Sequence, residues 1–115
     1  MLLVCRFIVP DADAPGFLAH ARRALQLLTA QPGCRGGELG RSPDDPQRWV
    51  LLARFDSVVA YRRALAPFDV REHVVPLLSD AVTGEPATFE VLLDAAHGRV
   101  AEHASLLDDP HDLGH

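Results

Sequence analysis

The sequence predicts an α+β fold in which four strands and two helical regions follow one another as strand, helix, strand, strand, helix, strand. Short runs of branched and aromatic residues alternate with segments whose apolar residues recur at helical spacing. Prolines and glycines separate these segments. The 115 residues suit one domain, and an apolar content of 48% with 23% charged residues excludes wholesale disorder.

The first strand and the first helix are predicted within residues 2–31. Residues 2–9 form an apolar run that Pro10 ends, which is typical of a strand. We expect Asp13 to cap the following helix, with Pro15 in its first turn. The sequence Gln31-Pro32-Gly33 stops this helix. The apolar stripe of this predicted helix comprises Phe17, Leu18, Ala21, Leu25 and Leu28.

A hairpin, a broken helix and a last strand are predicted to follow. Two strand-like runs, 35–41 and 49–55, flank a polar turn, and three glycines in the first run predict a bulge or an irregular edge. Ser57 offers an N-cap to the second helix, which Pro67 breaks. A further helical segment over residues 70–78 is disturbed by Pro76, and residues 87–93 are predicted as the final strand.

The order of these elements predicts a ferredoxin-like β-α-β-β-α-β domain over residues 1–94. Residues 95–115 form a polar, acidic tail that we expect to be partly helical or loose. Within it, the spacing of Val100, Ala104 and Leu107 predicts a helical turn or two, and the last eight residues are expected to be loose.

Both faces of the predicted sheet are apolar. Alternation places one wholly apolar set under the helices; this set is Leu3, Cys5, Phe7, Val9, Leu51, Ala53, Phe55, Phe89, Val91 and Leu93. The other face is also too apolar for water, so we expect a homodimer packed sheet to sheet. Its apolar members are Leu2, Val4, Ile8, Val50, Leu52 and Leu92.

Charged side chains lie near the strand middles of this second face. We expect Arg6 between Glu90 and Arg54, with Arg54 facing Glu38. The pattern leaves two interpretations open, a polar ligand site inside the dimer and a compensated ion network at its interface.

Composition excludes several classes of protein. A formal charge of −5 argues against a nucleic-acid binder, which needs a basic face. No apolar run approaches the roughly 18–20 residues that span a membrane, and the N-terminal run lacks the basic region of a signal peptide. Cys5 and Cys34 form no CxxC pair, so we expect buried, reduced thiols in a cytoplasmic protein. No metal site is predicted, because the tail histidines lack convergent acidic partners.

Three segments carry a resemblance to a known family. A strand that ends in Phe55-Asp56-Ser57 runs into a helix bearing Ala60-Tyr61-Arg62, and Pro32-Gly33 precedes the second strand. Over about residues 1–94 the chain resembles the antibiotic biosynthesis monooxygenases of the dimeric α/β-barrel superfamily. The resemblance implies a ferredoxin-like fold that forms a dimeric α/β barrel.

The resemblance also implies a chemistry. Cofactor-free members hold a phenolic or anthrone-like substrate between helices and sheet, and its carbanion reacts with dioxygen without metal or flavin. The family's tyrosine falls on Tyr61 and a helix arginine on Arg71, while His73 is placed to act as a base near neutral pH. These three are the predicted catalytic residues. The predicted substrate is a small aromatic or polyketide-like compound. The predicted walls of its site are Phe7, Leu51, Phe55 and Phe89.

Two other functions stay open. The family's strand asparagine and tryptophan fall on Leu51 and Phe55, which removes two polar groups and favours a non-catalytic binding or interaction dimer of the same fold. The haem-degrading branch uses a helix histidine as iron ligand and a first-strand asparagine, and the nearest residues are His73 and Cys5. Haem binding through His73 is therefore a third hypothesis.

Overall fold

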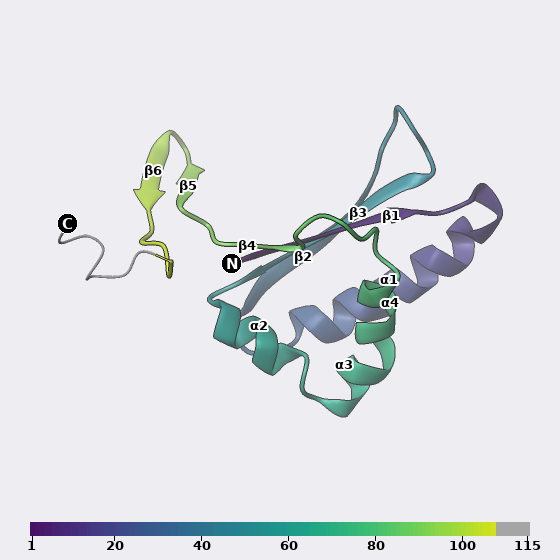
Figure 1. Ribbon diagram of the computed structural model, residues 1–115, viewed down its shortest axis with the longest axis horizontal. Coiled ribbons are helices and arrows are strands. Elements are labelled where there is room, and N and C mark those ends of the chain that lie inside the picture. Colours follow the sequence, from purple (N-terminus) through teal and green to yellow (C-terminus); the bar gives the residue numbers. More distant parts are fainter. Residues whose placement is uncertain (108–115) are drawn as a thin grey trace.

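Helices pack on one face of a four-stranded antiparallel sheet in the computed structural model, which describes residues 1–107 (Figure 1). The strands are β1 (Leu2–Ile8), β2 (Cys34–Arg41), β3 (Arg48–Phe55) and β4 (Thr88–Phe89), in the order β2-β3-β1-β4. Neighbouring strands are antiparallel throughout. This order and pairing confirm the predicted ferredoxin-like arrangement.

The helices begin and end largely where proline, glycine and capping residues direct. A 3₁₀ turn, η1 (Asp11–Asp13), leads into α1 (Ala14–Thr29), which has a proline in its first turn. The second helical region is divided into α2 (Val58–Ala64), α3 (Phe68–His73) and α4 (Val75–Ser79). Pro67 precedes α3 and Pro76 lies in the first turn of α4, so both prolines interrupt the helix as predicted.

The two predicted helix caps have different outcomes. The Ser57 hydroxyl accepts a hydrogen bond from the Ala60 amide at 3.0 Å, which confirms it as the cap of α2. The Asp13 prediction is wrong in one respect: Asp13 occupies the N-cap position of α1, but its side chain makes no capping hydrogen bond. Its backbone is already helical because η1 runs directly into α1, whereas a capping residue ordinarily has extended backbone.

The hairpin of β2 and β3 forms as predicted, with its irregularity at the expected place. The register shifts between Cys34 and Gly36, which is the bulge that the glycines predict. A Cβ atom on Gly37 would lie 2.9 Å from Leu25 Cδ2 and from the Leu52 carbonyl oxygen. The missing side chain therefore lets α1 approach the sheet closely.

The face of the sheet under the helices forms the core. The buried residues of this face in the predicted first and third strands are those that alternation predicts, namely Leu3, Cys5, Phe7, Val9, Leu51, Ala53 and Phe55. Ala21, Ala24 and Leu28 of α1 and Val70, Val74 and Leu77 of the α3–α4 region pack against them. Leu18 is instead exposed, so the buried stripe of α1 is centred on its alanines.

The prediction for the last strand is wrong in length and in register. Only Thr88 and Phe89 pair with β1, and Phe89 lies directly opposite Leu2 on the open face of the sheet, with 41% of its surface exposed. A shift of one residue moves every side chain of a strand to the other face. Val91 and Leu93 lie beyond this sheet, and Leu93 is exposed.

Residues 93–102 form a second, separate hairpin where a helical turn was expected. Strands β5 (Leu93–Ala96) and β6 (Arg99–Glu102) are joined by His97 and Gly98, with φ of 54° and 78°. Two successive residues with positive φ are typical of a tight type I′ hairpin turn, so the helical prediction for this stretch is wrong. The predicted loose segment 108–115 lies outside the described residues.

The open face of the sheet carries the predicted apolar rows and a different set of ion pairs. Arg54 Nη1 lies 3.7 Å from Glu38 Oε1, which confirms the expected pair. Arg6 instead pairs with Glu85, at 3.2 Å between Nη1 and Oε2. Glu90 accepts hydrogen bonds from the Ser105 hydroxyl and the Leu106 amide, because the chain turns away from the sheet after Phe89. No helix of residues 1–107 has the length and apolarity to cross a membrane.

Candidate functional site

Tyr61 lies against the core on α2, the helix that follows β3. The ring of Tyr61 meets that of Phe55 edge-on, with centroids 5.3 Å apart and an interplanar angle of 66°. The Ser57 cap starts α2, and the Tyr61 amide bonds to the Ser57 carbonyl at 3.1 Å. Gly33 allows α2 to lie close to the start of β2, because a Cβ there would lie 2.7 Å from Ala60 Cβ. A cap and a glycine thus place this tyrosine.

The surroundings of Tyr61 keep its phenol protonated. Burial raises the pKa of Tyr61, and the nearby Cys5 thiol raises it further. Among residues 1–107 no hydrogen bond is made by the Tyr61 hydroxyl. A protonated phenol without a protein partner is a hydrogen-bond donor that is available to a ligand oxygen.

Cys5 borders the same region from β1, and its thiol is a weak nucleophile. Burial raises the pKa of the Cys5 thiol to about 11, which outweighs the lowering by Arg6. The thiolate is the nucleophilic form, so Cys5 acts as an apolar wall near neutral pH. Both cysteines are free thiols, with Cys5 buried as expected and Cys34 half-buried.

Arg71 and His73 lie on α3, which packs against α1. The Arg71 side chain is exposed, and His73 is half-buried with its Nε2 atom 3.9 Å from Glu72 Oε2. Within the described part of the chain, no hydrogen bond or ion pair joins either residue to Tyr61. The fold therefore puts the three predicted catalytic residues on the consecutive helices α2 and α3 without joining Tyr61 to the other two by a polar interaction in residues 1–107.

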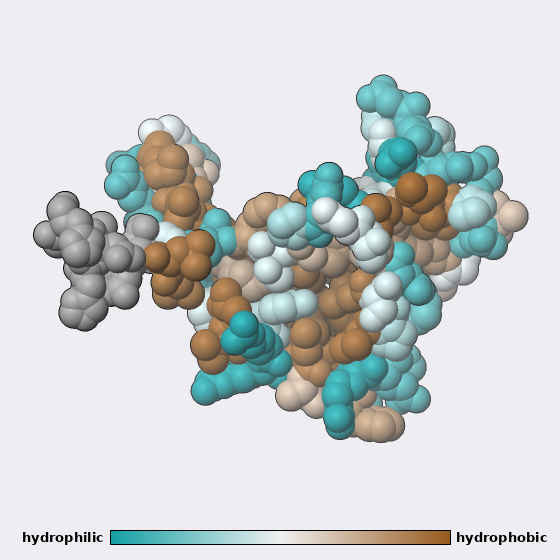
Figure 2. Space-filling model, viewed as in Figure 1, coloured by the Kyte–Doolittle hydropathy of each residue, from teal (hydrophilic) through white to brown (hydrophobic). Residues whose placement is uncertain are grey.

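The four predicted wall residues are split between the two faces of the sheet. Phe7, Leu51 and Phe55 are buried under the helices, and the Phe7 ring packs on Phe17 of α1 at 5.0 Å. Phe89 is on the opposite face and cannot line the same site. Figure 2 shows hydrophobic side chains gathered between α2 and the α3–α4 region, on the surface that overlies this core.

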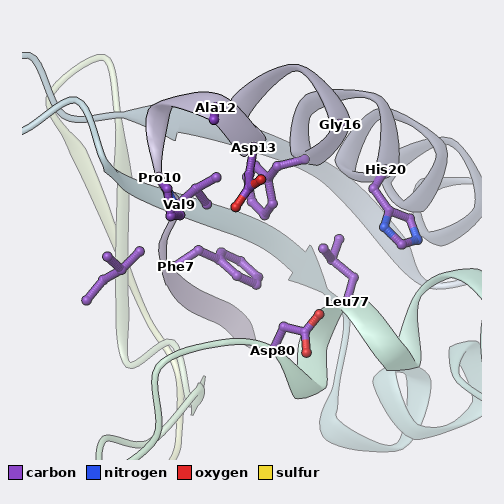
Figure 3. A pocket seen from close by; sticks show the side chains of 11 residues that line it. Phe7, Val9, Pro10, Ala12, Asp13, Gly16, His20, Leu77 and Asp80 are labelled. Atoms are coloured by element: carbon purple, nitrogen blue, oxygen red, sulfur yellow. The ribbon is translucent and has the colours of Figure 1, made fainter.

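A hollow of about 480 Å³ opens at the other end of the inner face (Figure 3). It lies between the end of β1, the start of α1 and the end of α4. Phe7, Val9 and Leu77 supply an apolar floor, and the Asp13 and Asp80 carboxylates enter it from opposite walls, with His20 at the side.

The polar residues of this hollow are absent from the predicted site. The sequence signals pointed elsewhere, since Asp13 occupies a capping position and His20 falls on the outer side of α1. Only the meeting of α1 with α4 brings Asp80 to them.

A second hollow of about 540 Å³ lies across the open face of the sheet. Gly40 and Val50 are among its floor residues, and the loop over residues 82–85 forms a rim. Three arginines are among its lining residues, and all three are ion-paired within the chain: Arg6 with Glu85, Arg41 with Asp11 and Arg48 with Asp45. Arg41 lies over the Trp49 ring, with its Cζ atom 4.8 Å from the ring centroid. The Trp49 Nε1 atom is buried without a hydrogen-bond partner in the described residues.

Metal chemistry has no ready site in the part of the chain that the structure describes. Residues 1–107 contain no group of three or more histidine, cysteine, aspartate or glutamate side chains placed to hold a metal ion. Asp13, His20 and Asp80 therefore line their hollow without forming such a group.

Comparison with known proteins identifies the family. The family model for antibiotic biosynthesis monooxygenase matches residues 1–73, which include β1 to β3, α1, Tyr61 and α3. The chain belongs to the antibiotic biosynthesis monooxygenase family. This match confirms the predicted family. A search of curated proteins found no match to the sequence.

Several solved structures have a similar fold. SnoaB from Streptomyces nogalater, a cofactor-independent oxygenase, is 30% identical over 70% of this chain and 82% of its own, with a TM-score of 0.61. A conserved protein from Methanosarcina mazei is 15% identical over 73% of this chain and 82% of its own, also with a TM-score of 0.61. Rv0793 from Mycobacterium tuberculosis is 18% identical over 95% of this chain and 96% of its own, with a TM-score of 0.59. The last two similarities support the fold alone.

Proposed function

We propose that this family member is a cofactor-independent monooxygenase that oxygenates a small aromatic, polyketide-like compound held beside Tyr61. The proposal is supported by family membership, by the 30% identity to SnoaB, and by the placement of Tyr61. The observation that carries it is the half-buried Tyr61 phenol, which has a raised pKa and no hydrogen-bond partner in residues 1–107.

The Tyr61 hydroxyl is the electrostatic group in this mechanism. An anthrone-like substrate loses a proton from its methylene carbon, and the charge moves onto the carbonyl oxygen. The protonated phenol donates a hydrogen bond to that oxygen, which stabilises the anion. Dioxygen then adds to the carbanion carbon, one oxygen atom stays as a new carbonyl, and the other leaves with two hydrogens as water. Substrate and dioxygen balance against quinone and water without a further reductant.

Arg71 and His73 are the candidates for the remaining polar roles. His73 is half-buried and carries an imidazole, the side chain that serves most often as a general base. Arg71 is exposed, and its guanidinium supports an oxyanion only if the substrate reaches the surface of α3. Both assignments therefore require a substrate that extends from Tyr61 toward α3.

The test is dioxygen uptake by the full chain with anthrones and naphthohydroquinones. We expect uptake above the buffer rate, with a fall of about 10²-fold in Tyr61→Phe, as for loss of one oxyanion donor. Ser79→Ala is the matched control, since it removes an exposed hydroxyl that bonds to the Val75 carbonyl at 2.9 Å. Uptake that is equal in Tyr61→Phe and wild type contradicts the role of Tyr61.

A binding protein without turnover is the second candidate. It is favoured by Leu51 and Phe55, which are only 1% and 2% exposed and fill the inner face with apolar atoms. Binding of an anthrone or naphthoquinone, seen as quenching of tryptophan fluorescence, without any dioxygen uptake would support this alternative.

We also propose that the protein is a homodimer packed through the open face of the sheet. Ile8 is 54% exposed on this face, and Phe89, Leu2, Val4, Val50 and Leu52 extend the apolar surface. Arg54 pairs with Glu38, and Arg6 pairs with Glu85. These ion pairs provide each charge with a partner when the dimer interface buries it. Light scattering is expected to give twice the mass of 12.5 kDa, and a monomer at all concentrations would contradict the proposal.

A further inference from the structure

The arginines of the four-stranded sheet and those of the helices differ in their partners. Every arginine on β1, β2 and β3 forms an ion pair with a carboxylate of the same chain; these are Arg6, Arg35, Arg41, Arg48 and Arg54. The arginines on the helices form no ion pair within residues 1–107; these are Arg22, Arg23, Arg62, Arg63 and Arg71. Only the helix arginines therefore keep their charge for a partner outside the chain.

Helices α1 and α2 carry charge of one sign only. Each contains a pair of adjacent arginines and no aspartate or glutamate, as their sequences APGFLAHARRALQLLT and VVAYRRA show. Exposed helices ordinarily mix both signs, because opposite charges three or four residues apart stabilise a helix. In α3, by contrast, Asp69 and Glu72 accompany Arg71. Since the whole chain has a formal charge of −5, α1 and α2 form a basic region on an acidic protein.

The positions of these arginines direct them away from the sheet. Arg23 follows the buried Ala21 by two residues, and Arg62 precedes the buried Ala64 by two residues. Two residues correspond to about 200° around an α-helix, so both arginines lie opposite the buried side of their helix. Figure 1 shows α1 and α2 on the same side of the sheet. The two helices therefore present their arginines on one outer surface.

Exposed apolar side chains accompany the arginines of α2. Val59 is 53% exposed and lies one helical turn before Arg62 and Arg63, so the three share one side of the helix. Phe68, the first residue of α3, is 68% exposed. Figure 2 shows hydrophobic and hydrophilic side chains next to one another over α2. Arginine beside exposed aromatic and aliphatic side chains is typical of protein–protein interfaces.

We propose that the outer surface of the helices docks an acidic protein, one that presents carboxylates around an apolar side chain. The residues of this basic helix surface are Arg22, Arg23, Val59, Arg62, Arg63 and Phe68. The carboxylates pair with the arginines that have no partner in residues 1–107, and the apolar side chain packs on Val59 and Phe68. The docked protein lies next to the candidate site, because α2 also carries Tyr61.

Other anionic partners match this surface less well. The phosphates of a nucleic acid offer no apolar contact to Val59 or Phe68, and the formal charge of −5 repels a long polyanion. A helix that lies on a membrane keeps its apolar side apart from its charged side. In α2, Val59 instead shares its side with two arginines. The mixture of charge and apolar surface therefore favours a protein.

Fluorescence anisotropy with a labelled acidic peptide tests the basic helix surface. The probe is a helical peptide with glutamates on both sides of a leucine stripe, and its control peptide has glutamine in place of every glutamate. We expect the full chain to bind the glutamate peptide at least about tenfold more tightly than the glutamine peptide in about 50 mM salt. Raising the salt to about 500 mM should reduce this difference. Equal binding of the two peptides at low salt overturns the proposal.

Two double variants with the same net charge show where the peptide binds. Arg62→Ala with Arg63→Ala removes both arginines of α2, and Arg48→Ala with Arg99→Ala removes one arginine from β3 and one from β6. We expect the first pair to weaken binding of the glutamate peptide about tenfold and the second pair to change it by less than about twofold. Val59→Ala should weaken it about threefold. Equal losses in the two double variants would mean that only net charge matters and would refute the surface.

Two further probes separate a protein partner from other polyanions. They are vesicles of phosphatidylglycerol and phosphatidylcholine, and single-stranded oligothymidylate. We expect both to bind more weakly than the glutamate peptide. Tighter binding of either probe, lost in the Arg62→Ala, Arg63→Ala chain, would assign the surface to a membrane or a nucleic acid and overturn the proposal. Circular dichroism verifies that each variant is folded, and none of these measurements uses dioxygen uptake, so they are independent of the proposed oxygenation.

Discussion

Leu51→Ala should be among the most destabilising single truncations of this chain. Leu51 lies mid-strand in β3, is 1% exposed, and is paired with Cys5 and Leu39 on either side. Removing three buried carbons loses about 2 kcal/mol of transfer free energy, and the cavity adds to it, for a total of about 3 kcal/mol.

This loss translates into a measurable fall in melting temperature. The unfolding entropy of a 115-residue chain is about 0.24 kcal/mol/K, so the expected fall is about 12 °C. The assay is thermal and urea unfolding followed by circular dichroism. Leu93→Ala is the matched control, because the same truncation at a side chain that is 62% exposed should cost less than about 0.5 kcal/mol in the monomer.

The comparison also bears on function. If Leu51→Ala costs no more than Leu93→Ala, then the side chain of Leu51 already borders empty space, and the packed-core description of the inner face is wrong. A loss near 3 kcal/mol would instead show that Leu51 is closely packed, which leaves no room for a substrate at this position of the inner face.

Three further predictions follow from groups near the core. The pKa of the Cys5 thiol is raised from 9.0 to about 11, so the folded state holds this proton more tightly than the unfolded state does. The free energy of unfolding should therefore fall as the pH rises from about 9 to 11. Urea titrations at each pH measure this slope, and Cys5→Ala should flatten it. At pH 8 in a thiol-reagent assay, the half-buried Cys34 should react well before Cys5, and equal rates would contradict the burial of Cys5. Gly33→Ala should destabilise more than Gly84→Ala in thermal melts: both have positive φ, at 84° and 97°, but only at Gly33 does a Cβ meet another atom, Ala60 Cβ at 2.7 Å.

The helical regions and the first three strands could be predicted from the sequence because their signals are local. Pro10, Pro67 and Pro76 interrupt the chain for steric reasons that hold in any tertiary setting. Ser57 caps α2 through its own hydroxyl, and the glycines of β2 permit the bulge. The family also followed from contiguous residues, since Phe55 to Arg62 carry both the strand end and the helix start.

The candidate site was predictable only in part. Tyr61 could be singled out because it follows a recognisable strand end, and its place beside Phe55 follows from one short connection. Asp13, His20 and Asp80 share a hollow because α1 and α4 meet across the end of β1. No sequence spacing relates residues that far apart, so this hollow had no local signal.

The sequence alone determined the order of elements, the inner face of β1 and β3, and the family, since each depends on nearby residues and on the two-residue period of a strand. Only the tertiary structure decided the register of Phe89, the partners of Arg6 and Glu90, and the hairpin over residues 93–102. Alternation placed Phe89, Val91 and Leu93 on the inner face and Glu90 on the other face, but alternation does not fix where a strand pairs with its neighbour or in which register. Pairing with Leu2 of β1 made that choice, and the turn at His97-Gly98 then set the hairpin apart from the sheet.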